Sequence, residues 1–187
     1  MVGQANGNVT GIAVGNGTVL WNFATGGAVR AAAAASGNLV YIGSTDHHVY
    51  ALDAATGRKV WSFAAGAPIL DTGAIVSHYT YNGGQLELAI GADNGELYVL
   101  DAANGSLFYH LSVPGEILGV GSAEGIVVVE TSKGIVSAVR AYTPLDVWKY
   151  DTGGSLPSAP VLLDGTIYVA ASDGHLYAFT TFGQPPD

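Results

Sequence analysis

The chain has 187 residues, of which 49% are hydrophobic, 11% are charged and 27 are glycine, and this composition excludes intrinsic disorder. Six Lys and Arg stand against 15 Asp and Glu, for a formal net charge of -9, so the basic surface that nucleic-acid binding requires is missing. Cysteine is absent, which excludes disulfides, thiolate nucleophiles and cysteine-held metal or haem sites.

Neither a membrane span nor a leader is predicted. The alanine-rich stretch 28–35 contains Arg30 and is followed by Ser36 and Gly37, so it falls short of the roughly 20 apolar residues that a membrane helix needs. Residues 1–7 are small and polar and lack a charged segment followed by an apolar one. We therefore expect no signal peptide in this chain.

One sequence unit recurs along the chain, and an aromatic residue at one position anchors it. The gap-free stretch 49–63 is matched by 9–23, 97–111 and 136–148, and 167–179 matches 40–52. The anchoring residues are Trp21, Trp61, Tyr109 and Trp148. A period of about 40 residues is typical of a propeller blade.

Short runs within each unit alternate apolar and small residues and end at Gly, Asp, Asn or Ser, which indicates strands and hairpins. Asn94-Gly95, Lys133-Gly134 and Asp173-Gly174 occupy the same place in three copies and predict tight turns. The alanine run 28–35 falls where other copies have their first strand, so we predict strand there despite its helix propensity. The sequence therefore predicts an all-β fold of four-stranded antiparallel blades, about four of them in this chain.

Residues 49–57 and the Val60-Trp61 pair resemble the repeat of the pyrroloquinoline-quinone-type (PQQ-like) β-propellers, with its Ala-x-Asp-x-x-Thr-Gly-x-x-x-Trp docking motif. The resemblance covers nearly the whole chain and implies a propeller fold. The family includes quinoprotein dehydrogenases, a lipoprotein of outer-membrane protein assembly and extracellular sensor domains. One unit departs from the motif, because Arg140 replaces its Asp and 141–144 replace Ala-Ala-Thr-Gly, while Trp148 is kept.

The repeat divides the chain into blade units. They are an incomplete blade at 1–24, units at 25–64, 65–112 and 113–151, a unit at 152–183 without its last strand, and a tail at 184–187. We interpret the chain as the C-terminal half of a propeller of seven or eight blades. The alternatives are a homodimer, with 18–23 of each copy completing an eight-bladed ring, and a four-bladed ring closed by one chain.

The repeated side chains favour structural roles. An aromatic residue at repeat spacing packs between blades, so Trp21, Trp61, Tyr109 and Trp148 are predicted to dock neighbouring blades. Asp53 and Asp101 precede the Ala-Ala-Thr-Gly or Ala-Ala-Asn-Gly turn, where a short acceptor satisfies turn amides. We predict that they stabilise these corners.

Histidines supply the candidate metal ligands. His48 aligns with His175, and neutral imidazoles from two blades bind metals when the fold brings them together. Since their copies are not adjacent in the run of blades, solvated loop histidines are the favoured interpretation, and no metal is predicted.

An eight-residue insertion at 77–84 lengthens one hairpin. Loops that depart from a rigid repeat are frequent recognition sites. His78, Tyr79 and Tyr81 are therefore the candidate surface-contact residues.

Three functions are consistent with these observations. The first is a non-catalytic scaffold that binds a protein or an extended peptide; the second is half of a quinoprotein dehydrogenase; the third is a sensor for a small ligand such as a sugar in the channel. The absence of cysteine argues against the second, which alone would require PQQ and calcium, and no catalytic motif is present. We expect no cofactor, a protein partner and, from the resemblance, an extracytoplasmic location.

Overall fold

The computed structural model describes residues 1–71, 73–80, 83–143 and 145–181, without the side chains of 78–80 and 83–84. Regular structure within these residues consists of 18 strands in five antiparallel sheets. The first sheet contains β1 (Val2–Gly3), β2 (Asn8–Ile12) and β3 (Val19–Ala24). The second contains β4 (Ala34–Ser36), β5 (Leu39–Gly43), β6 (His48–Asp53) and β7 (Lys59–Ala64).

The remaining sheets repeat this order. The third contains β8 (Ala74–Thr80), β9 (Gly83–Gly91), β10 (Glu96–Asp101) and β11 (Leu107–Ser112). The fourth contains β12 (Ile117–Ala123), β13 (Ile126–Thr131), β14 (Ile135–Arg140) and β15 (Asp146–Asp151). The fifth contains β16 (Val161–Leu163), β17 (Thr166–Ala170) and β18 (Leu176–Thr180). Within the described residues, the first and fifth sheets therefore have three strands each, at the positions of the second to fourth and the first to third strands.

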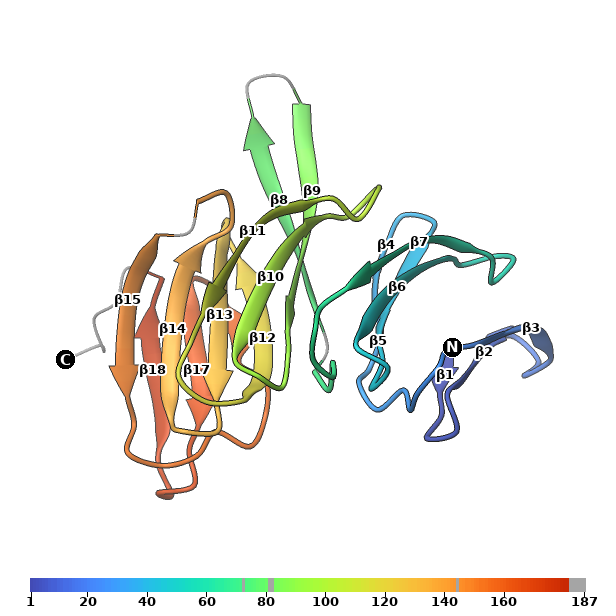
Figure 1. Cartoon of the computed structure of the whole chain (residues 1–187). Helices are drawn as coiled ribbons and strands as arrows, with labels where there is room; N and C mark the ends of the chain where they lie inside the picture. Colours follow the sequence, from blue (N-terminus) through green and yellow to red (C-terminus); the bar gives the residue numbers. More distant parts are fainter. Residues whose placement is uncertain (72, 81–82, 144, 182–187) are drawn as a thin grey trace.

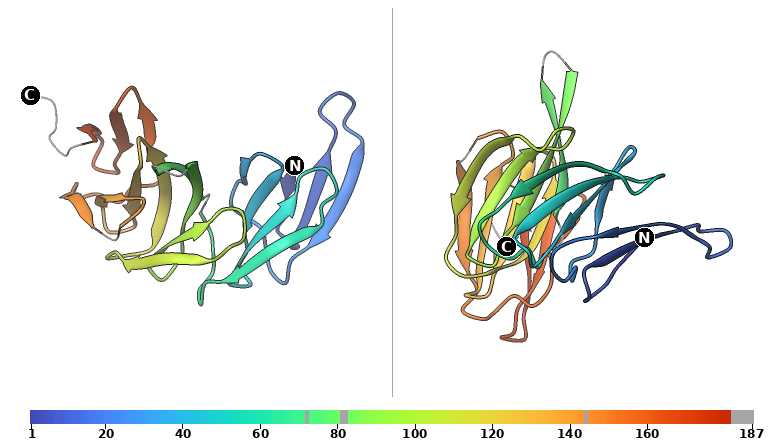
Figure 2. Two further views of the ribbon diagram at one scale, coloured as in Figure 1. Left: turned by 90° about the horizontal axis from the view of Figure 1, so that it is seen from above. Right: turned by 45° about the vertical axis from the view of Figure 1, so that its right-hand side comes forward.

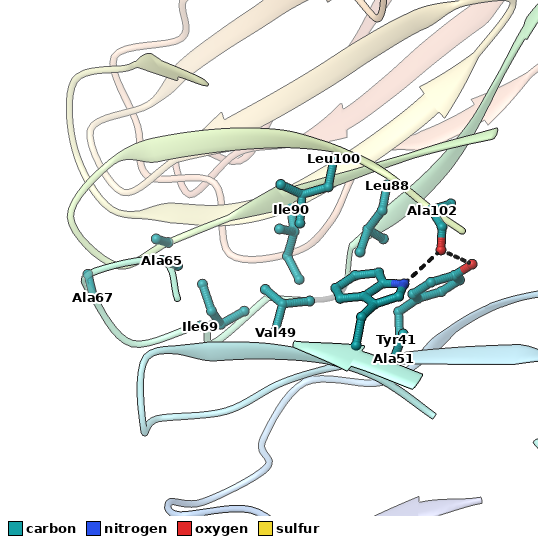
Figure 3. Close-up of a cluster of buried hydrophobic side chains, with 12 residues drawn as sticks. Tyr41, Val49, Ala51, Ala65, Ala67, Ile69, Leu88, Ile90, Leu100 and Ala102 are labelled. Carbon is teal, nitrogen blue, oxygen red and sulfur yellow. Dashed lines mark hydrogen bonds between the residues drawn. The ribbon is translucent and has the colours of Figure 1, made fainter. Parts of the chain in front are cut away.

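The sheets follow one another as an open arc, with the first and fifth sheets at opposite ends (Figures 1 and 2). The four-bladed ring closed by one chain, one of the alternatives drawn from the sequence, is therefore not the arrangement of these sheets. Four apolar clusters lie between successive sheets. Figure 3 shows the cluster between the second and third sheets, where Val49 and Ala51 face Leu88 and Ile90. The core of this protein thus lies between its sheets, as in the blades of a β-propeller.

Backbone geometry follows from the predicted turn residues. Gly95, Gly134 and Gly174 have φ of 83°, 80° and 89° in the hairpins between second and third strands. His47 takes the corresponding position with φ 70°, a conformation that costs more without glycine. Each of the first four sheets also carries a register shift between its third and fourth strands, and such bulges increase local twist.

Small residues allow the sheets to approach closely. A Cβ added at Gly43 would lie 2.1 Å from Cγ2 of Ile69, and one at Gly91 would lie 2.2 Å from Cγ2 of Ile117. Real atoms do not approach this closely, so the second strands of the second and third sheets require glycine where the next sheet's entering segment packs on them.

The alanine run differs from the prediction. Strand pairing covers only Ala34–Ser36, and residues 28–33 are irregular apart from a bend. The segment instead crosses from the first sheet to the second, with the Val29 amide donating to the Gln4 carbonyl and the Thr45 amide to the Ala28 carbonyl. These crossing bonds replace a sheet ladder over this stretch.

Candidate functional site

The outward face of the fifth sheet is apolar, and no other part of the described chain covers it. Val9, Val49, Leu97 and Val136 share one register position in four sheets, and each is 0% exposed because the next sheet covers it. Leu176 at the same register is 71% exposed. Val161, Leu163 and Tyr168 are exposed on the same face. We call these four residues, together with Ala178, the terminal face.

The terminal face is bordered by the edge of β18, which pairs with no strand among the described residues. The Ala171 amide donates to the His175 carbonyl, and since antiparallel pairs alternate, the N–H groups of Leu176 and Ala178 point away from β17. In the three complete sheets a fourth strand pairs at this edge. An extended segment of another chain would find the same donors and acceptors here.

The aromatic residues of the fourth strands each reach a carbonyl of the following sheet. The indole N–H of Trp21 donates to the Ala54 carbonyl at 2.9 Å, and that of Trp61 to the Ala102 carbonyl at 3.1 Å. Tyr41 also donates to Ala102, so two side chains converge on one oxygen (Figure 3).

The other two aromatic residues make equivalent bonds. Tyr109 donates to the Arg140 carbonyl at 2.6 Å and Trp148 to the Thr181 carbonyl at 3.4 Å. The residue opposite each aromatic is Gly11, Ala51, Val99 or Ala138. Ala178 occupies this register in the fifth sheet, where none of the described strands lies opposite it.

Asp53 and Asp101 lie at the corners that receive these aromatic side chains. One carboxylate oxygen of Asp53 accepts from the amides of Ala55 and Thr56 and from the Thr56 hydroxyl. The bonds from Thr56 hold the pKa of Asp53 below its usual value. Asp101 accepts from the Ala103 and Asn104 amides in the same way. Both corners are thus fixed by side-chain acceptors.

His48 and His175 lie on the second and fifth sheets, with two complete sheets between them, so the fold does not bring them together. His48 Nδ1 lies 3.6 Å from the Asp46 carboxylate, and His175 Nδ1 lies 3.1 Å from the Asp173 carboxylate. No group of three or more His, Cys, Asp or Glu within the described residues could hold a metal ion.

The carboxylates beside these histidines bind tyrosine hydroxyls. Tyr50 donates to Asp46 at 2.7 Å, and Tyr177 to Asp173 at 2.6 Å. Burial acts to raise the pKa of Asp46, but hydrogen bonds from Tyr50 and from the Gly26 and His48 amides outweigh it and lower the pKa. Since Gly26 belongs to the link from the first sheet, Asp46 joins two sheets.

The candidate contact residues lie on the long hairpin. β8 and β9 pair from Ala74 opposite Ala89 to Thr80 opposite Gly83, and the hairpin projects beyond its neighbours (Figure 1). Tyr81 and the side chains of His78 and Tyr79 lie outside the described residues.

Sequence reasoning did not identify two buried carboxylates. Glu130 is 0% exposed, and neither of its carboxylate oxygens has a hydrogen-bond partner among the described residues. It occupies the register at which the other sheets have Gly3, Gly43, Gly91 and Ala170. Glu87 is 3% exposed beside Asp101. The break in the repeat at Glu130 is the signal that could have identified it.

Two tryptophans of the repeat are buried in the packing between sheets. The resemblance implies that the quinoprotein dehydrogenases hold their cofactor with adjacent cysteines, a stacking tryptophan and acidic calcium ligands, whereas this chain has no cysteine. Trp21 and Trp61 are buried against the following sheet, with their N–H groups bound to carbonyls. Their rings are therefore engaged in sheet packing.

A known protein family matches most of the chain. The family described as outer membrane protein assembly factor BamB matches residues 5–118 and 95–183. The chain belongs to this BamB family of PQQ-like repeat β-propellers.

Two curated members resemble the chain. Outer membrane protein assembly factor BamB of Moranella endobia (strain PCIT) is 26% identical, covering 79% of this chain and 40% of the relative. That of Shewanella oneidensis is 33% identical, covering 52% of this chain and 24% of the relative. The chain therefore spans less than half the length of these relatives.

Solved structures resemble it in fold. BamB from Moraxella catarrhalis has a TM-score of 0.76 at 19% identity, covering 97% of this chain and 58% of that chain. The computationally designed Ika8 protein has a TM-score of 0.81 at 20% identity, covering 95% of this chain and 54% of that chain. The fold is thus a β-propeller arc.

The described part of the chain contains no helix long and apolar enough to cross a membrane.

Proposed function

We propose that this chain is a non-catalytic scaffold that binds an extended segment of a partner protein at the terminal face. One observation carries the proposal: Leu176 is 71% exposed, whereas the residue at the same register of each of the other four sheets is 0% exposed. Because an uncovered apolar face beside unpaired strand donors favours strand addition, a protein segment is the ligand that fits.

The register defines that segment. A strand added to β18 would place one residue opposite Ala178, and the equivalent residues of the first four sheets are Trp21, Trp61, Tyr109 and Trp148. An aromatic side chain there would cover the terminal face. The segment therefore carries an aromatic residue and a second large apolar residue two positions later, as Phe23, Phe63, Leu111 and Tyr150 stand in the four strands.

The relatives' name supports a role in outer-membrane protein assembly and an extracytoplasmic location. We propose that the partner belongs to that process.

Two copies of the chain could also meet at their open ends. Val2 is 49% exposed on the first sheet, whereas Ile42 at the same register of the second sheet is 1% exposed. Both ends of the arc thus expose apolar residues that sheets cover elsewhere, which favours a homodimer that closes the ring.

The binding proposal is tested with a labelled peptide of residues 57–65, which contains Trp61 and the β7 strand. Fluorescence anisotropy should show saturable binding, weakened about tenfold or more by Ala178→Pro, which removes the edge donor. Ala178→Gly is the matched control, because glycine keeps the donor and stands opposite Trp21 in the first sheet. Equal binding by all three proteins would contradict the proposal.

A further inference from the structure

The second, third and fourth sheets each end in an outer strand, and these strands are β7, β11 and β15. Each of the three sheets has a neighbouring sheet on both sides (Figures 1 and 2), while the far edge of its outer strand pairs with no strand among the described residues. An exposed edge attracts further strands unless charged side chains, prolines or bulges block it. All three strands carry a bulge, so their side chains distinguish one edge from another.

Charged side chains lie along β7 and β15. The Lys59 ammonium donates to the Ser62 hydroxyl at 3.4 Å, so a positive charge lies along β7. On β15, Lys149 and Asp146 form an ion pair at 2.8 Å. An incoming apolar strand would have to remove water from these charges, which is costly. The edges of β7 and β15 are therefore protected.

β11 has no such protection. Its sequence contains no Lys, Arg, Asp, Glu or Pro. Leu107 stands at the register of Lys59 and Asp146 and is 44% exposed, and the adjacent Phe108 is 43% exposed. Two large apolar side chains therefore stand where the neighbouring sheets place a charge.

The backbone of β11 presents hydrogen-bonding groups along this edge. The Val113 amide donates to the Gly95 carbonyl, and since antiparallel pairs alternate, the N–H and C=O groups of His110 and Ser112 point away from β10. The side chains of these two residues turn back across the sheet to Glu96. His110 Nδ1 lies 2.9 Å from one carboxylate oxygen, and the Ser112 hydroxyl donates to the other. The edge is thus left accessible.

The corner of the fourth sheet adds exposed apolar groups beside β11. Tyr109 of β11 donates to the Arg140 carbonyl at this corner, where the repeat departs from its motif. Tyr142 and Leu145 at the same corner are 45% and 61% exposed. The departure from the motif therefore enlarges the apolar surface on this side of β11.

We propose that the outer edge of β11 binds an extended, apolar segment of a partner protein, which adds to the third sheet as a fifth strand. A strand is the occupant that fits, because outward backbone donors and acceptors stand beside exposed apolar side chains. The site goes beyond the binding proposed at the terminal face, since it lies on a complete sheet between two others and needs neither end of the arc.

The test follows the backbone amide signals of the chain by NMR during titration with the peptide acetyl-Lys-Thr-Val-Thr-Val-Thr-Lys-amide, whose terminal lysines keep it soluble. The protein carries Ala178→Pro, so that the edge of β18 does not contribute. We expect saturable shift changes and slowed hydrogen exchange at His110 and Ser112. Ser62 and Ala64, the equivalent residues of β7, should change little.

Two further variants, made in the same background, test the edge itself. Leu107→Lys places on β11 the residue that β7 has at this register, and should weaken binding about tenfold. His110→Pro removes an outward donor and should weaken binding to a similar extent, because proline is tolerated only where its N–H side is free. Ser62→Pro on β7 is the matched control and should leave binding unchanged.

The absence of shift changes along β11 would overturn the proposal, as would binding that neither Leu107→Lys nor His110→Pro weakens. Because every measurement is made with the β18 edge closed, failure here is distinct from failure at the terminal face.

Discussion

Trp61 shows how one side chain holds two sheets together. Its ring is 8% exposed within the cluster between the second and third sheets, and its N–H reaches the Ala102 carbonyl. We predict that Trp61→Ala lowers the free energy of unfolding by about 3–5 kcal/mol, because it leaves a cavity and removes one of the two hydrogen bonds to the Ala102 carbonyl. Urea denaturation would measure this.

The control is Val60→Ala. Val60 precedes Trp61 and is 52% exposed, so its truncation should change stability by no more than about 0.5 kcal/mol. A loss of similar size in both variants would contradict the docking role of Trp61.

Glu130 gives the chain a pH-dependent stability. Burial, and then the nearby Asp71 carboxyl, raises the pKa of Glu130 from 4.5 to about 8, and burial with Asp101 raises that of Glu87 to about 7. An unfolded glutamate ionises at lower pH, so the folded state keeps protons that the unfolded state releases. The stabilisation that protonated Glu130 gives to the folded state is complete below about pH 4.5 and is lost as pH rises through about 8.

We therefore predict that the free energy of unfolding falls between pH 5 and pH 8.5, with a limiting slope of about 1.4 kcal/mol per pH unit for one group. The fall should be shallower in Glu130→Gln, since the amide does not titrate. Glu116→Gln, at an exposed position, should retain the wild-type slope. Denaturation at several pH values measures this, and identical slopes in all three proteins would refute it.

At the scale of elements, close approach of the sheets depends on glycine in the second strands. We predict that Gly43→Ala costs about 1–3 kcal/mol, because the new methyl group collides with Ile69. Gly15→Ala, where nothing lies within 4 Å, is the control and should be nearly neutral.

A double-mutant cycle identifies the cause. In an Ile69→Ala background the collision is removed, so Gly43→Ala should cost clearly less than in the wild type. Additive losses would show that Gly43 acts through backbone conformation rather than through packing.

The strands were largely predictable from the repeat. Alternation and turn residues placed β5, β6 and β7, and the insertion at 77–84 lengthens the β8–β9 hairpin as predicted. The alanine run was less predictable, since Ala34–Ser36 alone is strand. Alternation cannot fix boundaries in a run of identical small residues, because either face could be buried.

The candidate site was harder to predict from the sequence than the strands were. The exposure of Leu176 depends on the absence of a sixth sheet among the described residues. Periodicity records which residues face a neighbour, but not whether that neighbour is present. The hydrogen-bond partners of Trp61 and Asp53 could not be predicted from the sequence, because one lies in the next sheet and the other lies across a turn.

At the scale of the whole molecule, an arc with two apolar ends should associate. We predict that the chain without a partner segment has a solution mass about twice its 19.0 kDa, and that saturating 57–65 peptide lowers this mass by competing for the terminal face; light scattering over a dilution series would measure both. Combining Leu176→Glu with Val161→Glu on the terminal face should return the mass to that of one chain, since burying unpaired charge is costly. A folded monomer at all concentrations would contradict the dimer.

The central claim is that a partner strand pairs with the free edge of β18. Amide hydrogen exchange followed by NMR tests it most directly, with and without the 57–65 peptide. The account predicts new protection at Leu176 and Ala178, whose N–H groups point outward, and little change at Tyr177, already bonded to β17. Unchanged exchange along β18 under saturating peptide would contradict the account.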